Sequence, residues 1–272
     1  MKIALIQMYA GPTPEQALQR AAEQLRLAKQ QGADLAVLPE MFCCPYETPA
    51  FPRFAQPTGG QVWQALRQLA IDNEIYLAAG SVPEAAEGKV YNTAYAFAPD
   101  GTQLAAHRKM HLFDIDVQGG QRFFESETLT AGAAATTFPT PWGVFGLCVC
   151  YDIRFPELFR IMADKGAVAT LIPAAFNMTT GPLHWELLHR ARAVDNQMFL
   201  FGAAPARDPQ SSYQSWAHSI AVSPWGRVLG QLEEQPGILM IEPDFAEVAA
   251  VRQQIPALAH RRSALYHIEH TL

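Results

Sequence analysis

Short apolar runs and amphipathic segments alternate along the chain from its first residues. Residues 2–8 and 33–39 are apolar runs of strand length. Between them the apolar side chains recur at helical spacing: Leu18, Ala21, Ala22, Leu25 and Ala28. Thr13 is a favourable helix cap, Pro14 suits the first helical position, and Gly32 is a typical helix stop. This stretch is therefore predicted to fold as strand, helix and strand.

The same alternation continues to the end of the chain. Four further segments have the periodicity or the boundary residues of helices: 61–72, 156–166, 184–197 and 245–254. Apolar runs typical of strands lie among them: 75–82, 91–99, 144–150, 167–173, 198–205, 218–226 and 237–244. Asp100 and Gly101 form a hairpin signal. Together they predict an α/β fold with a mixed sheet covered by helices, in one domain over residues 1–272.

Composition narrows the class of protein. The chain has 272 residues, 49% hydrophobic and 17% charged, which excludes a largely disordered chain. Its net charge of -6 argues against nucleic-acid binding, which needs a basic surface. Apolar runs are too short for a transmembrane helix or a signal peptide, so we expect a cytoplasmic protein. P-loop, dinucleotide-binding and serine-hydrolase motifs do not occur in the sequence.

Three polar residues directly follow apolar runs that are predicted to be strands. In α/β sheets, residues at the ends of strands line ligand crevices. Glu40 ends LAVLPE, and half-burial would suit its carboxyl group to general-base work; the alternative is an ordinary loop carboxylate. Cys150 lies at a predicted strand-to-helix turn, where backbone N–H groups lower a thiol pKa; the alternative is a buried structural cysteine, as we expect of Cys148. Lys109 follows an alternating strand, and the alternative is a solvated lysine.

A thiol, a carboxylate and an ammonium group together suit amide cleavage. The thiolate attacks the carbonyl, the carboxylate moves the proton, and the ammonium group stabilises the oxyanion. The sequence alone does not show that the three residues meet. A second interpretation takes the four cysteines as metal ligands, but adjacent Cys43 and Cys44, and Cys148 and Cys150 in one strand, lack the spacing of zinc sites. We therefore expect no metal.

Three segments carry a resemblance to the carbon–nitrogen hydrolase, or nitrilase, superfamily. They are LAVLPEMF around Glu40, HRKMHLFD around Lys109 and CYDIRFPEL from Cys150. The resemblance extends over nearly the whole chain. It implies a four-layer α-β-β-α sandwich, assembly into a homodimer or larger homo-oligomer, and no organic cofactor.

The resemblance also implies the roles of individual residues. Cys150 would be the nucleophile, Glu40 the general base and Lys109 the residue that stabilises the oxyanion. A second glutamate follows the lysine in the superfamily and helps to position lysine and substrate. Glu125 fits that place, and Glu127 is the alternative.

Further residues are candidates for the oxyanion hole and the substrate pocket. The resemblance places the backbone N–H of Tyr151 in the oxyanion hole. Four residues are candidates for contacting the substrate: Tyr46, Arg154, Phe176 and Thr179. Arg154 suits an anionic substrate, and its alternative is a structural ion pair with Asp152 or Glu157.

Within the superfamily the chain looks most like the ω-amidases. The similar segments are HLFDIDVQGGQRFFESETLTAG, PAAFNMTTGPLHWELLHRARAVDNQ, PARD and RQQIP. Such enzymes release ammonia from 2-oxo dicarboxylate monoamides such as α-ketoglutaramate and α-ketosuccinamate. One alternative is a sister amidase that acts on deaminated glutathione or an N-carbamoyl compound. Another is a scaffold that has lost catalysis, against which the presence of all three catalytic residue types argues.

Overall fold

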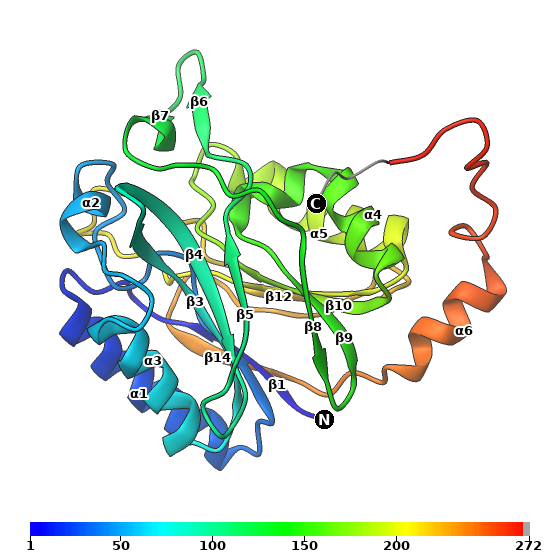
Figure 1. Cartoon of the computed structure of the whole chain (residues 1–272), viewed down its shortest axis with the longest axis horizontal. Helices are drawn as coiled ribbons and strands as arrows, with labels where there is room; N and C mark the ends of the chain where they lie inside the picture. Colours follow the sequence, from blue (N-terminus) through cyan, green and yellow to red (C-terminus); the bar gives the residue numbers. More distant parts are fainter. Residues whose placement is uncertain (269–272) are drawn as a thin grey trace.

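The computed structural model describes residues 1–268 and contains two six-stranded sheets that face each other (Figure 1). The first sheet contains, in order, β14 (Gly237–Ile241), β1 (Ile3–Gln7), β2 (Leu35–Val37), β3 (Tyr76–Ala86), β4 (Lys89–Phe97) and β5 (Gln103–Arg108). The second contains β13 (Val228–Gln231), β12 (Ile220–Val222), β11 (Phe199–Ala203), β10 (Ala167–Pro173), β9 (Gly143–Leu147) and β8 (Thr136–Thr140). In each sheet three parallel strands are flanked by antiparallel ones.

Helices cover both outer faces. The first sheet is covered by α1 (Pro14–Gln30) and α3 (Gln61–Asp72), and the second by α4 (Pro156–Asp164) and α5 (Gly181–Asn196). The other helices of the described residues are α2 (Ala50–Phe54), α6 (Ala246–Gln254) and the 3-10 turns η1 (Glu125–Glu127) and η2 (Cys150–Arg154). The predicted α-β-β-α sandwich is confirmed. Within residues 1–268 no helix has the length and apolar character needed to cross a bilayer.

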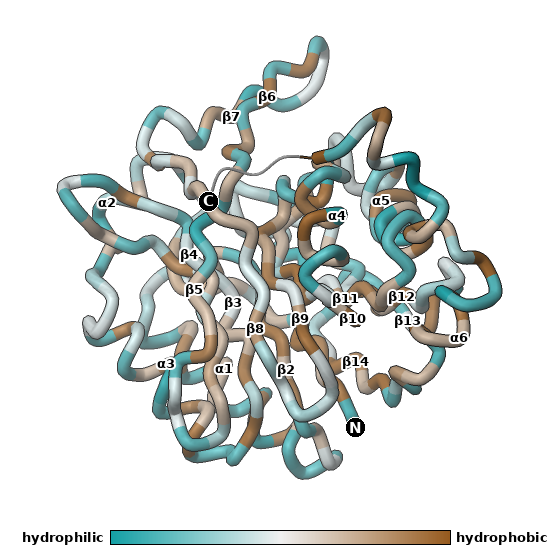
Figure 2. Tube along the Cα trace, turned by 45° about the vertical axis from the view of Figure 1, so that its right-hand side comes forward, coloured by the Kyte–Doolittle hydropathy of each residue, from teal (hydrophilic) through white to brown (hydrophobic). Residues whose placement is uncertain are grey.

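The alternation of side chains along the strands explains the layers. Ile3 and Leu5 of β1 pack into the core between the sheets, which also contains Phe201 of β11. Ala4 and Ile6 of the same strand point the other way, into the core under α1 and α3. Successive strand residues face opposite sides of a sheet, so a strand covered on both faces is apolar throughout. Figure 2 shows these hydrophobic positions concentrated along the strands and hydrophilic ones in the outer loops.

Several sequence predictions need correction. The run 144–150 is a strand only as far as Leu147, because the backbone turns into η2 at Cys150. The helix predicted at 184–197 begins earlier, at Gly181. The start of α1 is as predicted, with Thr13 Oγ1 accepting a hydrogen bond from the backbone N–H of Gln16 at 3.5 Å. The hairpin of β6 (Asp114–Asp116) and β7 (Arg122–Phe124), which projects from the body in Figure 1, was not predicted.

The topology brings the ends of distant strands to one edge. β2 and β3 are parallel, and β4 is antiparallel to both β3 and β5. β5 therefore runs in the same direction as β2, and the segments that follow β2 and β5 leave the first sheet on the same side. The hydrogen bonds of Lys109, which follows β5, reach Glu40, which follows β2. The segment after β9 in the second sheet, which carries Cys150, meets them there.

Candidate active site

Cys150 lies on a strained turn between β9 and α4. Its φ angle is 47°, in the left-handed region that non-glycine residues seldom adopt. The turn presents the thiol to the gap between the sheets, where Cys150 is 4% exposed. The backbone N–H of Ala175, after β10, donates to Cys150 Sγ at 3.5 Å. A single strained residue thus carries the thiol to the meeting point of the two sheets.

Glu40 reaches the same point from the end of β2. Its Oε1 atom accepts hydrogen bonds from Lys109 Nζ at 2.9 Å and from Asn92 Nδ2 at 2.8 Å. Its Oε2 atom is buried and has no hydrogen-bond partner among the described residues. Gly80 makes this turn possible, because a Cβ there would lie 2.2 Å from the carbonyl oxygen of Pro39. One carboxylate oxygen is thus anchored, and the other is free to accept a proton.

Lys109 is fully buried and joins two carboxylates. Its Nζ atom donates to Glu40 Oε1 and to Glu125 Oε1, each at 2.9 Å. Burial by itself lowers the pKa of a lysine, but the carboxylates of Glu125 and Glu40 outweigh it and raise the pKa of Lys109 above its usual value. The ammonium group is therefore a permanent positive charge.

Glu125, and not Glu127, contacts Lys109. Its Oε1 also accepts a hydrogen bond from Tyr46 Oη at 2.9 Å, and its Oε2 accepts one from the backbone N–H of Phe113 at 2.8 Å. Glu127 is exposed and lies 3.7 Å from Arg122. Burial and the nearby charge of Glu40 raise the pKa of Glu125, with Lys109 opposing them. Glu125 thus fixes Lys109 from the side opposite Glu40.

The thiol of Cys150 is not acidified by its surroundings. Burial and the negative charge of Glu40 raise its pKa well above the usual value, while Lys109 and the backbone N–H of Ala175 lower it less. This is opposite to the effect expected from a helix start. A thiol with a raised pKa beside a free carboxylate oxygen suits proton transfer to Glu40 at the moment of attack.

The candidates for substrate contact fall in different places. Arg154 and Phe176 line a cavity of about 10 Å³ beside Cys150, together with Phe113, Tyr151, Ala175 and Thr180. Thr179 does not line it: its side chain is exposed, and Thr180 takes that place. Tyr46 donates a hydrogen bond to Glu125 and packs against Tyr213, with ring centroids 4.4 Å apart and ring planes tilted by 30°.

The expected ion-pair alternative for Arg154 is wrong. Asp152 bonds to His107 and His111, and Glu157 forms no ion pair with Arg154 within residues 1–268. Arg154 Nη1 instead lies 3.1 Å from His184 Nδ1.

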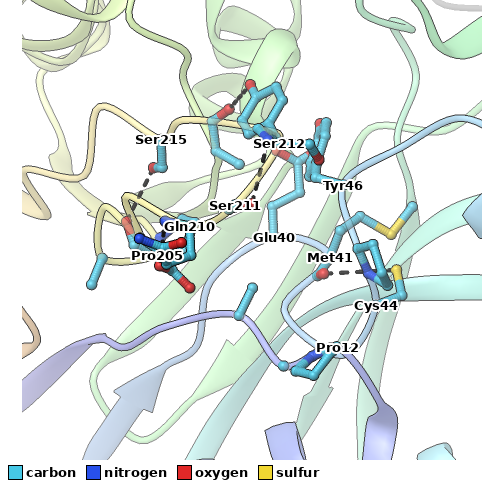
Figure 3. Close-up of a pocket in the computed structure, with 17 residues that line it drawn as sticks. Pro12, Glu40, Met41, Cys44, Tyr46, Pro205, Gln210, Ser211, Ser212 and Ser215 are labelled. Carbon is cyan, nitrogen blue, oxygen red and sulfur yellow. Dashed lines mark hydrogen bonds between the residues drawn. The ribbon is translucent and has the colours of Figure 1, made fainter.

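A larger cavity of about 290 Å³ lies on the other side of Glu40 (Figure 3). Figure 3 shows Met41 and Cys44 on one side of it, and Gln210 and Pro205 of the loop after β11 on the other. Its lining includes Glu40 and Asp208, and none of the described lining residues is Lys, Arg or His. The two cavities share Ala175 as a wall and differ in charge.

Two residues of the site were missed from the sequence. Asn92 of β4 anchors Glu40 Oε1 through its side chain, and its backbone carbonyl accepts a hydrogen bond from the Lys109 N–H at 2.8 Å. An asparagine inside an apolar strand was the available signal. Tyr213 donates from its hydroxyl to the carbonyl of Ala175 at 2.5 Å, and it belongs to a loop without any periodic pattern. In the described part of the chain, no cluster of three or more His, Cys, Asp or Glu side chains is arranged to hold a metal ion.

The sequence and fold match known proteins over nearly the whole chain. The carbon-nitrogen hydrolase family model matches residues 2–253. "Omega-amidase NIT2-A" of Xenopus laevis is 48% identical over 268 residues, which cover 98% of this chain and 97% of that protein. "Omega-amidase NIT2" of Homo sapiens is 46% identical with the same coverage.

Solved structures agree with these relatives. Nit3 of Saccharomyces cerevisiae, described as a member of branch 10 of the nitrilase superfamily, has a TM-score of 0.88 and 40% identity, covering 96% of both chains. A variant of the amidase from Nesterenkonia sp. AN1 has a TM-score of 0.80 and 28% identity, covering 97% of this chain and 95% of that one. That variant carries the acetamide moiety of fluoroacetamide on its active-site cysteine. The chain therefore belongs to the carbon–nitrogen hydrolase family and is an amidase of the nitrilase superfamily.

Proposed function

We propose that this amidase is an ω-amidase, which hydrolyses the terminal amide of 2-oxo dicarboxylate monoamides such as α-ketoglutaramate and α-ketosuccinamate. The names of its relatives support this substrate class. The observation that carries the proposal is Arg154, a half-buried cation at the wall of the Cys150 cavity. The products are the 2-oxo acid and ammonia.

Arg154 has the surroundings of a residue that receives an anion. Within residues 1–268 no carboxylate forms an ion pair with it, and its Nε atom has no hydrogen-bond partner. Its guanidinium group lies 5.4 Å from the ring centroid of Tyr151 and 5.1 Å from that of Phe176. A partly buried charge without a counterion is unfavourable. The carboxylate of the substrate would supply the counterion and leave its amide end beside Cys150.

Acylation follows from the placement of Cys150 and Glu40. Glu40 Oε2 takes the thiol proton as Cys150 Sγ attacks the amide carbon, so a C–S bond forms and the carbonyl π electrons move to oxygen. Lys109 Nζ and the Tyr151 N–H, which belongs to the first turn of η2 and has no acceptor inside that turn, stabilise the oxyanion. The C–N bond then breaks as Glu40 returns the proton to nitrogen. Ammonia leaves, and a thioester remains.

Deacylation uses the same groups in reverse order. Glu40 removes a proton from water as the water oxygen attacks the thioester carbon, and Lys109 again faces the oxyanion. The C–S bond breaks, the proton on Glu40 returns to Cys150 Sγ, and the 2-oxo acid leaves. Throughout, Glu125 and Tyr46 hold the ammonium group in place through the hydrogen bonds described above.

Substrate binding requires the site to widen. The cavity beside Cys150 has about 10 Å³, roughly the space of one water molecule. A five-carbon substrate therefore enters only if wall side chains move, and the aromatic ones are Phe113, Tyr151 and Phe176. The neighbouring cavity without cations lies on the Glu40 side, where the proposed orientation places the departing nitrogen.

A matched panel of amides tests the proposal. Ammonia release is measured with α-ketoglutaramate, with its methyl ester, with an N-carbamoyl amino acid and with a simple nitrile. The proposal predicts that kcat/KM for α-ketoglutaramate exceeds that for the ester by at least about 10-fold, because a hydrogen-bonded charge contributes about 1.5–3 kcal/mol. Equal rates for acid and ester, or faster turnover of the N-carbamoyl compound, would contradict it.

The superfamily resemblance implies a homodimer or larger homo-oligomer, and we also propose that two copies associate through the outer face of α5. This face exposes Leu183 and Leu187, which are 75% and 62% exposed, and neighbouring Trp225. Large exposed apolar patches are typical of protein interfaces. Sedimentation of the wild type and of Leu187→Glu tests this: the wild type should be dimeric or larger and the variant smaller. A monomeric wild type would refute it.

A further inference from the structure

Asp152 is a buried carboxylate that the mechanism above does not use. It is fully inaccessible to solvent, and four donors bind it. Oδ1 accepts from the backbone N–H of His111 at 3.0 Å and contacts His111 Nδ1 at 2.7 Å. Oδ2 accepts from the backbone N–H of Val149 at 3.0 Å and contacts His107 Nε2 at 2.9 Å. A buried carboxylate with four partners has defined positions for both oxygens.

The four donors belong to the two segments that carry the catalytic groups. His107 and His111 flank Lys109, two residues before it and two residues after it. Val149 immediately precedes Cys150. The first segment continues β5 of the first sheet, and the second follows β9 of the second sheet. One carboxylate therefore joins the two sheets where the thiol must meet the ammonium group.

Neighbouring contacts extend this junction. His107 Nδ1 lies 2.9 Å from Thr136 Oγ1 in β8. The ring of His111 stacks on Phe155, with centroids 3.5 Å apart and planes 9° apart. Each histidine thus has a second contact besides Asp152, which restricts its position. Despite the opposing effect of burial, hydrogen bonds from His107 and His111 hold the pKa of Asp152 well below its usual range.

We propose that Asp152 is a positioning residue that sets the distance between Cys150 Sγ and Lys109 Nζ by clamping their two segments together. The proposal rests on the proposed function only in taking Cys150 as the nucleophile. Asp152 makes none of its four contacts to Cys150, Lys109 or Glu40. Its effect is transmitted through the backbone, and the strained φ of Cys150 needs such support.

Substitution of Asp152 tests the clamp. Asp152→Asn preserves shape but directs an amide NH₂ group at donors, so at least one contact is lost. A displacement of about 1 Å in a reacting group costs up to about 100-fold. We expect kcat to fall about 10- to 100-fold with KM changed less than about 3-fold, because the substrate carboxylate is bound elsewhere. Asp164→Asn, which alters an exposed partner of Arg261, is the matched control and should leave kcat unchanged.

A second readout does not depend on the substrate. The rate at which iodoacetamide alkylates Cys150 is measured against pH in each variant. The thiol pKa depends on the distances to Glu40 and Lys109, so a displaced turn shifts this profile, whereas a mere loss of stability does not. If the wild type released no ammonia from α-ketoglutaramate, the proposed function would fail, and the alkylation profile would still test the clamp.

A milder variant covers the case in which Asp152→Asn does not fold. His111→Phe keeps the stacking on Phe155 and the backbone N–H but removes the contact from Nδ1 to Oδ1. We expect a smaller loss of kcat, about 3- to 10-fold, and a shifted alkylation profile. Folded Asp152→Asn or His111→Phe protein with wild-type kcat and an unchanged profile would overturn the proposal.

Discussion

Two regions around Cys150 differ in how completely their polar groups are bonded. In the first, the proposed catalytic cluster of Glu40, Lys109, Glu125 and Cys150, almost every side-chain polar atom has a hydrogen-bond partner in the cluster or in a neighbouring residue. Glu40 Oε2 is the exception, and it is the atom assigned to proton transfer. In the second, the acyl-side wall of Arg154, Phe176 and Thr180, a guanidinium nitrogen has no partner and the cavity is small.

This difference distinguishes the residues proposed to carry out the reaction from those proposed to bind the substrate. The catalytic cluster is organised before substrate arrives, so its hydrogen bonds need no rearrangement during the reaction. In the proposed function, the acyl-side wall is completed only by the substrate. Substitutions in the cluster should therefore act mainly on kcat, and those in the wall mainly on KM.

Removal of the nucleophile has the largest expected effect. Cys150→Ala should lower kcat for ammonia release by at least about 10⁴-fold, because the acyl-enzyme can no longer form. Steady-state ammonia release measures this, with Cys148→Ala as the matched control, since Cys148 is buried two residues away and is expected to be structural. Ammonia release that survived in Cys150→Ala would show that the thiol is not the nucleophile and that the cluster around it does not carry out the reaction.

Substitution of Glu40 distinguishes its two effects on Cys150, which are proton transfer during the reaction and the rise in the thiol pKa. Glu40→Gln should lower kcat about 10²- to 10⁴-fold, because no group at Oε2 then accepts the proton. The pKa of the Cys150 thiol should fall, even though the enzyme loses activity. The negative charge of Glu40 raises that pKa, so its removal shifts the pH profile of iodoacetamide alkylation to lower pH. A profile that moved to higher pH would contradict the assigned geometry.

The acyl-side wall is tested by removing its cation. Arg154→Gln should lower kcat/KM for α-ketoglutaramate about 10- to 100-fold, mostly through KM, and should leave the methyl ester almost unaffected. Arg26→Gln, at an exposed position of α1, is the control. If acid and ester lost activity equally, Arg154 would act on the catalytic cluster instead of on the substrate carboxylate.

The smallest expected effect concerns the anchor of Glu40. Asn92→Ala removes one of the two hydrogen bonds to Oε1, while Lys109 keeps the other. We expect kcat to fall about 10-fold with KM unchanged, since a hydrogen bond to a charged group contributes about 1.5–3 kcal/mol and part of the anchoring persists. Asn73→Ala at the end of α3 is the control. A change in KM alone would assign Asn92 to binding.

Part of the fold and the three central residues could be predicted from the sequence for identifiable reasons. Apolar alternation predicted most of the strands and the covering helices, but in one mixed sheet. The sandwich of two sheets and the joint roles of Glu40, Lys109 and Cys150 were implied by the family resemblance of the motifs around these residues. The same patterns did not predict the end of β9, because apolar residues continue past Leu147 while a single left-handed residue ends the strand. The sign of the thiol pKa shift was also wrong, because burial and Glu40 were not included.

Contacts between distant segments could not be predicted. Tyr213 joins the site from a loop without a periodic pattern, and the partner of Asn92, a polar residue in a predicted strand, depends on the tertiary fold. Asp152 was considered only as a partner of Arg154, and its bonds to His107 and His111 depend on how the two sheets face each other. Thr179 and Thr180 are adjacent, so a shift of one residue at the start of α5 decides which of them lines the cavity. The cytoplasmic location stays a prediction.

Ammonia release from α-ketoglutaramate, with purified wild-type protein and Cys150→Ala measured side by side, is the decisive measurement. We predict steady release by the wild type and none above background by the variant. No release by a folded wild type would contradict the ω-amidase assignment, and equal release by both proteins would contradict the thioester mechanism.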